Sequence, residues 1–173
     1  MLIEFYGKLP HKSEFISPTE LSPIAQDLIA WIEQGQNHLG ESMLHTYDDG
    51  LCAYFFMIDQ PIVSSTITGM LFKSQDKKSR KYPFVVFHRC ADGSDDRLIL
   101  SGYRALFDEL GFDIAKLSQG MNHAFLFDGF LNFLQQNTLP MGNAIWQKMG
   151  DEKRFITDKL NVILYRKLMM GDV

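Results

Sequence analysis

The sequence predicts a three-layer α/β/α fold of the α+β class, in which helices cover both faces of a central sheet. Residues 51–58 (LCAYFFMI) and 84–88 (FVVFH) are continuously apolar, and residues 66–72 (TITGMLF) form another strand-like run between them. Continuous hydrophobicity is typical of strands that are buried on both faces, which requires helices on each side of the sheet. From residue 98 onward, apolar residues recur with helical spacing, which predicts a helical C-terminal half.

Residues 1–90 are expected to form the strand-rich half, with one major helix. Residues 2–6 (LIEFY) predict a short strand that ends at Gly7. Two helix-start signals follow, Ser17-Pro18-Thr19-Glu20 and Ser22-Pro23, so we expect one short turn and then a longer helix. Apolar residues occupy one face of this helix, which is expected to end near Gly35.

Residues 98–170 are expected to form the helical half. Apolar side chains recur at intervals of three or four residues in three stretches, which are 103–110, 127–134 and 160–168. At least three helices are therefore expected, with a shorter segment around Trp146. The sequence contains no repeat, low-complexity stretch or linker, so residues 1–173 are expected to form a single domain.

The composition excludes several classes of partner. The chain has 173 residues and a formal net charge of -4, which argues against general binding to nucleic acid. It has no signal-peptide pattern and no apolar run of about 18 residues, so we expect a cytoplasmic protein without membrane insertion. Cys52 and Cys90 both lie in or beside apolar strand-like runs and are expected to be reduced thiols in the core.

The sequence lacks the common catalytic and cofactor motifs. GxxxxGK[ST], GxGxxG, HExxH, GxSxG and CxxC are all absent, and the histidines stand singly. We therefore expect a protein that is not an enzyme and that has no metal or cofactor. One alternative is a hydrolase-like enzyme whose site forms around Ser74, Asp76 and His88, brought together by folding. Another is an adaptor that binds small GTPases, for which fold analogy is the sole support.

Residues 73–83 (KSQDKKSRKYP) form a basic loop between two predicted strands. In one interpretation, Ser74 and Asp76 hydrogen-bond the loop's own backbone to form the turn, and the lysines remain solvated. In the other, Arg80 makes a planar, bidentate contact with a carboxylate. That carboxylate could belong to Asp76 or to a partner protein.

Two motifs resemble those of a known family. Residues 69–76 (GMLFKSQD) and 80–83 (RKYP) are similar to the pattern G-x-L-x-x-S-x-D-x-x-G-R-x-Y/F-P, and residues 5–10 (FYGKLP) with Phe15 are similar to the opening G-K-x-P-x-x-G-D-F. Both patterns belong to TagF, also called ImpM, an accessory protein of bacterial type VI secretion systems. This sequence departs from them at Ser79, where the family has glycine, and at Ser13-Glu14, where the family has Gly-Asp.

The resemblance implies both a fold and a function. The fold is a largely antiparallel sheet between two layers of helices. The function is that of a cytoplasmic, non-enzymatic regulator, generally a repressor, of type VI secretion assembly, with a forkhead-associated (Fha-type) scaffold as its partner. On this basis a protein-binding surface is expected, with Arg80 as its charged anchor, at Gly7, Lys8, Pro10, Ser74, Asp76, Arg80 and Tyr82.

Overall fold

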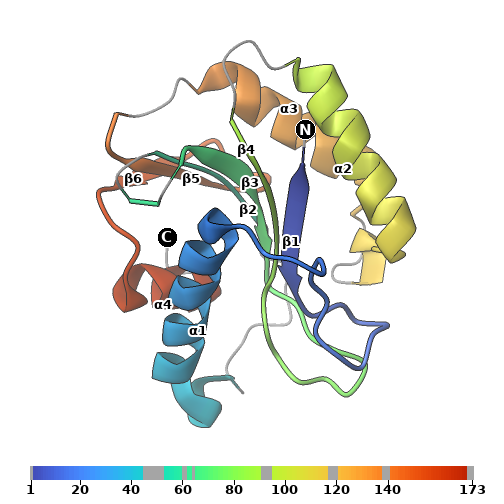
Figure 1. Ribbon diagram of the computed structural model, residues 1–173, viewed down its shortest axis with the longest axis vertical. Coiled ribbons are helices and arrows are strands. Elements are labelled where there is room, and N and C mark those ends of the chain that lie inside the picture. Colours follow the sequence, from blue (N-terminus) through green and yellow to red (C-terminus); the bar gives the residue numbers. More distant parts are fainter. Residues whose placement is uncertain are drawn as a thin grey trace.

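The middle layer of the structure is an antiparallel sheet (Figure 1). The computed structural model describes residues 2–44, 53–59, 62–63, 65–90, 95–116, 121–137 and 141–170. Within these residues the sheet has six strands in the order β1-β4-β3-β2-β5-β6, and every neighbouring pair is antiparallel. The strands are β1 (Ile3–Gly7), β2 (Ala53–Ile58), β3 (Ile67–Phe72), β4 (Phe84–Arg89), β5 (Ala144–Lys148) and β6 (Arg154–Thr157).

Helices cover both faces of the sheet, as the sequence predicts. Helices α1 (Pro23–Leu44) and α4 (Val162–Met170) lie on one face, and α2 (Asp96–Leu110) and α3 (His123–Gln136) lie on the other (Figure 1). A short 3-10 helix, η1 (Ile114–Lys116), follows α2. The α+β class and the three layers are confirmed.

The two faces of strand β2 explain its unbroken hydrophobicity. Tyr54 and Phe56 belong to the core beneath α1 and α4, whereas Phe55 and Met57 belong to the core beneath α2 and α3. Every residue from Ala53 to Ile58 is buried. Since successive side chains of a strand point to opposite faces, both faces of this strand must be apolar.

Helix α1 begins at Pro23 as expected but does not end near Gly35. The Ser22 hydroxyl accepts a hydrogen bond from the Ala25 N–H (3.2 Å) and caps the helix, whereas residues 17–20 form no helical turn, with a bend at residues 19 and 20. A Cβ at Gly35 would lie 2.1 Å from Cγ of Tyr165 in α4. Gly35 is therefore a packing position that allows α4 to approach α1, and α1 continues to Leu44, interrupted at Gly40 by a non-helical conformation.

The expectation of a helical half over residues 98–170 is wrong for residues 144–157, which include the separate segment expected around Trp146. These residues form the hairpin of β5 and β6, and β5 pairs with β2. Ile145 packs toward the α2–α3 layer, whereas Trp146 packs toward the α1–α4 layer. Because both faces of β5 are buried, the segment shows no strand-like alternation, and it is too short to be identified by length. One sheet thus unites both halves of the chain.

Two further expectations concern the cysteines and membrane insertion. Cys52 lies outside the described residues. Cys90 is a half-buried free thiol, and burial raises its pKa to about 11, so it remains protonated. Among the described residues, no helix combines the length and the apolar character that crossing a membrane requires.

Candidate functional site

The two predicted motifs lie on neighbouring loops at one end of the sheet (Figure 1). We call residues 7–16 and 73–83 the paired loops. The Lys77 N–H donates to the Lys12 carbonyl (2.8 Å), and the Ser74 hydroxyl donates to the Lys8 carbonyl (2.6 Å). Segments that are more than sixty residues apart in the sequence therefore form one surface.

The Asp76 carboxylate lies at the centre of the paired loops and is fully buried. Its Oδ2 accepts from Nε of Arg80 (2.6 Å) and pairs with Nζ of Lys8 (3.1 Å). Its Oδ1 accepts from the backbone N–H groups of Lys78 (2.8 Å) and Arg80 (3.0 Å). This one side chain therefore holds both loops together.

The hydrogen bonds of Asp76 keep its carboxyl group ionised. Burial by itself would raise the pKa of this group. The hydrogen bonds from Arg80, Lys8 and the Lys78 N–H stabilise the carboxylate more strongly, so the pKa of Asp76 lies well below its ordinary value of 3.8. The Asp76–Lys8 pair is consequently a buried ion pair of two charged groups.

Arg80 is directed toward Asp76, one of the two carboxylates considered for it, but it donates to that carboxylate through Nε alone and not in the expected bidentate geometry. Besides the bond to Asp76, its Nη2 donates to the Ser13 carbonyl (2.7 Å) on the other loop. About half of the side chain, 52%, is exposed. Arg80 is thus a cross-link of the paired loops that still presents part of its guanidinium to solvent.

The interpretation in which local bonds form the turn is partly confirmed. Asp76 does bond the loop backbone, but Ser74 bonds the other loop through Lys8. Lys77 and Lys78 are exposed as expected, whereas Lys73 is buried.

Ser79 occupies the position where the related pattern has glycine. Its φ is +60°, in the left-handed region that glycine adopts most readily. The Ser79 N–H donates to the Asp76 carbonyl (2.9 Å), and the Asp76 N–H donates to the Arg80 carbonyl (3.1 Å). Ser79 therefore adopts, in a hydrogen-bonded turn, the backbone conformation that glycine favours.

The surface beside the ion pair is aromatic and basic. The ring of Phe15 lies 4.6 Å from that of Tyr82 and 5.7 Å from that of Tyr6, and the Lys8 ammonium lies 4.8 Å from the Phe15 centroid. Phe15 is 46% exposed although it belongs to this cluster. An exposed aromatic ring beside cations is a common feature of protein interfaces.

The predicted site residues are brought together, but most of them cannot be touched by a partner. Pro10 is half-buried, Arg80 is exposed, and the remaining residues are buried: Gly7, Lys8, Ser74, Asp76 and Tyr82. The exposed charged and aromatic side chains of the same loops were not predicted as site residues; they are Lys12, Glu14, Phe15, Lys77 and Lys78. The excess of lysine in the loop sequence was the signal that could have identified them.

The residues of the hydrolase-like alternative do not meet. His88 pairs with Thr68 across β4 and β3, six positions before Ser74, which corresponds to about 20 Å along the strand. The Ser74 hydroxyl is already bonded to the Lys8 carbonyl. His88 is buried, and its Nδ1 lies 3.0 Å from the hydroxyl of Tyr103. Within the described residues there is also no group of three or more His, Cys, Asp or Glu side chains that could hold a metal ion.

Acidification from about pH 7 to about pH 5 is expected to destabilise the protein by about 2 kcal/mol through His88. The unfolded chain binds a proton at this imidazole near pH 6.5, whereas burial lowers the pKa of His88 in the folded protein to about 4. Stability is therefore complete above pH 6.5 and declines as the pH falls toward 4. Urea denaturation of a His88→Phe variant should show no such decline. An identical pH dependence of variant and wild type would contradict this assignment.

Comparisons with known proteins agree with the motifs and with the fold. Residues 4–136 match the family model of the TagF N-terminal domain, described as type VI secretion system-associated. No curated protein matches the chain significantly. The crystal structure of PA0076 from Pseudomonas aeruginosa PAO1 shares the fold, with a TM-score of 0.61 and 16% sequence identity over 98% of this chain and 94% of that one. Because the family model covers most of the sequence, including both loop motifs, the chain belongs to the TagF family of type VI secretion system-associated proteins.

Proposed function

We propose that the protein is a cytoplasmic, non-enzymatic regulator that represses assembly of the type VI secretion system. It acts by binding a cytoplasmic component of the machinery, with an Fha-type scaffold as the expected partner. Membership of the TagF family supports the association with this secretion system. The separation of His88 from Ser74 and Asp76 supports a binding role over a hydrolytic one.

The paired loops are the observation that carries this proposal. Lys12, Lys77 and Lys78 are exposed around the half-exposed Phe15, on a backbone that the buried Asp76 cross-links. Glu14 is the exposed acidic residue of these loops. This surface is locally basic in a chain of net charge -4, so it can steer an acidic partner surface to one place on the molecule.

Charge reversal of the exposed lysines tests the proposal. A Lys12→Glu/Lys77→Glu/Lys78→Glu variant is expected to capture the Fha-type scaffold at least about tenfold less well, because like charges would then face each other. Secretion, which overexpression of the wild type should repress, should remain active when this variant is overexpressed. Co-purification and a secretion assay measure the two effects.

A matched variant controls for net charge. Lys116, Lys159 and Lys167 are exposed outside the paired loops, and their joint replacement by glutamate changes the net charge equally. This control should bind the scaffold and repress secretion like the wild type. Normal secretion on overexpression of the wild type, together with no scaffold capture, would refute the proposal. Arg80→Glu is a poorer probe because it would place a second carboxylate beside Asp76 and weaken the loops themselves.

A further inference from the structure

Among the described residues of the paired loops, Phe15 is the only large apolar side chain that is exposed. The other exposed side chains of these loops include three lysines, Lys12, Lys77 and Lys78. An ammonium group is strongly hydrated and loses this hydration when a partner covers it, whereas covering an apolar ring is favourable. Of these four side chains, Phe15 is therefore the one that gains most from burial against a partner.

The Phe15 ring is held in place by its neighbours. It packs edge-on against Tyr82 and stacks on Tyr6, and the Lys8 ammonium lies 4.8 Å from its centroid. Tyr6 is fixed in turn, because its hydroxyl donates to Oε1 of Glu33 in α1 (3.1 Å). A ring that is already ordered loses little conformational entropy when a partner covers it.

The backbone on each side of Phe15 is also fixed. The Ile16 N–H donates to the Gly7 carbonyl (2.9 Å), and the Gly7 N–H donates to the Ile16 carbonyl (3.1 Å). On the other side, the Ser13 carbonyl accepts from Nη2 of Arg80 (2.7 Å). Rigid aromatic side chains of this kind dominate the binding energy of many protein interfaces. Phe15 thus has the properties of an interface anchor.

We propose that Phe15 inserts into an apolar pocket of the partner protein, and that carboxylates at the rim of that pocket face the lysines of the paired loops. This inference rests on the proposed function, because it concerns the same surface and the same partner. An apolar centre inside a polar rim is the usual arrangement of a protein interface. The two parts have different tasks: the lysines set the rate of association, and the ring sets the rate of dissociation.

An anionic membrane surface would attract the same lysines but fits the loops less well. Amphipathic membrane-binding segments bury several apolar side chains at the lipid interface, whereas the described paired loops expose one large apolar side chain. The exposed Glu14 directly precedes Phe15, and anionic headgroups would repel it. A protein pocket can accept a single ring without placing a carboxylate beside Glu14. These residues therefore favour a protein partner.

The variants Phe15→Met and Phe15→Gln test the apolar pocket. Methionine and glutamine have unbranched side chains of similar length, so this pair isolates polarity from size. Biolayer interferometry with the immobilised Fha-type scaffold measures both rates. Phe15→Gln should dissociate at least about tenfold faster than the wild type, because its amide would enter the apolar pocket without a hydrogen-bond partner. Phe15→Met should dissociate within about threefold of the wild-type rate.

The association rate separates the ring from the lysines. Both Phe15 variants should associate within about twofold of the wild-type rate, since neither changes the charge. Lys12→Glu/Lys77→Glu/Lys78→Glu should associate at least about tenfold more slowly. Phe125→Gln is the matched control, because Phe125 is 49% exposed and lies in α3, outside the paired loops. It should leave both rates unchanged.

A loss of stability cannot imitate the expected result. Dissociation is measured on molecules that have already bound in the folded state, so a partly unfolded variant would lower the amplitude of binding without raising the dissociation rate. If Phe15→Gln and Phe15→Met dissociated equally fast, the ring would not enter an apolar pocket. This inference would then be wrong, while scaffold capture by the wild type would leave the proposed function intact.

Two other outcomes would also overturn the inference. If the wild type neither captured the scaffold nor repressed secretion, the proposed function and the pocket for Phe15 would both be refuted. Sedimentation with vesicles of phosphatidylserine and phosphatidylcholine tests the membrane. Binding of the wild type to these vesicles, abolished by Phe15→Gln, would assign the surface to a membrane and exclude the partner pocket.

Discussion

An Asp76→Ala variant is expected to lose about 3–5 kcal/mol of the free energy of unfolding. The substitution removes the carboxylate that pairs with Lys8 and Arg80 and accepts two backbone N–H groups. Lys8 would then remain as a buried ammonium, since its side chain is only 8% exposed. Urea denaturation followed by circular dichroism measures the loss.

Two comparisons identify the cause of this loss. Asp108→Ala removes an exposed carboxylate from α2 and should change stability by less than about 0.5 kcal/mol. Adding Lys8→Met to Asp76→Ala removes the Lys8 ammonium group, which the loss of Asp76 leaves without its counter-ion. The double variant should therefore recover part of the stability. If the double variant were as unstable as the sum of both single variants, the pair would not be coupled, and the loss would arise from the loop backbone alone.

The layers of the fold could be predicted from local patterns, because a strand that is buried on both faces has a continuously apolar sequence. The unbroken run of β2 indicated helices on each side, and Ser22-Pro23 marked the start of α1. Gly35 misled the prediction because a glycine that admits a neighbouring ring looks the same in sequence as one that ends a helix. The difference depends on Tyr165, which lies 130 residues away.

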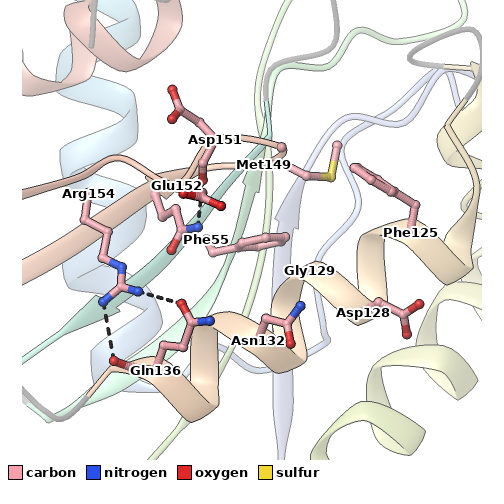
Figure 2. Close-up of a pocket in the computed structure, with 12 residues that line it drawn as sticks. Phe55, Phe125, Asp128, Gly129, Asn132, Gln136, Met149, Asp151, Glu152 and Arg154 are labelled. Atoms are coloured by element: carbon pink, nitrogen blue, oxygen red, sulfur yellow. Dashed lines mark hydrogen bonds between the residues drawn. The ribbon is translucent and has the colours of Figure 1, made fainter.

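The contacts of the candidate site could not be predicted in the same way. The family pattern located both loops, but the Ser74–Lys8 and Arg80–Ser13 bonds join residues 66 and 67 positions apart. Spacing within one loop carries no information about such bonds. The hollow of about 550 Å³ between α3 and the β5–β6 hairpin (Figure 2) was not predicted either, since its lining residues come from separate segments that lie side by side only after β5 joins the sheet.

The family motif and the accessible surface are therefore largely different sets of residues. Asp76, Ser74 and Gly7 are buried and fix the shape of the paired loops. Lys12 and Lys78 are exposed and occupy positions that the two patterns leave unspecified. Replacing one of these buried residues changes the backbone geometry of the paired loops, whereas an exposed lysine can be replaced without harm to the fold. We accordingly expect substitutions of the buried motif residues to act on stability and lysine substitutions to act on binding.

Gly7→Ala provides the second large test of this division, with an expected loss of about 4 kcal/mol or more. Gly7 has a φ of +134°, and a Cβ there would lie 2.0 Å from the Pro83 carbonyl oxygen and 2.8 Å from Cα of Phe84. Both contacts are with backbone, so β1 would have to separate from β4 where the paired loops begin. Thermal and urea denaturation measure the effect.

Gly111→Ala is the control, because Gly111 also has a positive φ but its Cβ would meet only the His11 ring at 3.4 Å. That variant should lose about 1–2 kcal/mol from backbone strain alone. Equal losses for the two variants would mean that the approach of the β1 and β4 backbones is not what requires glycine at position 7.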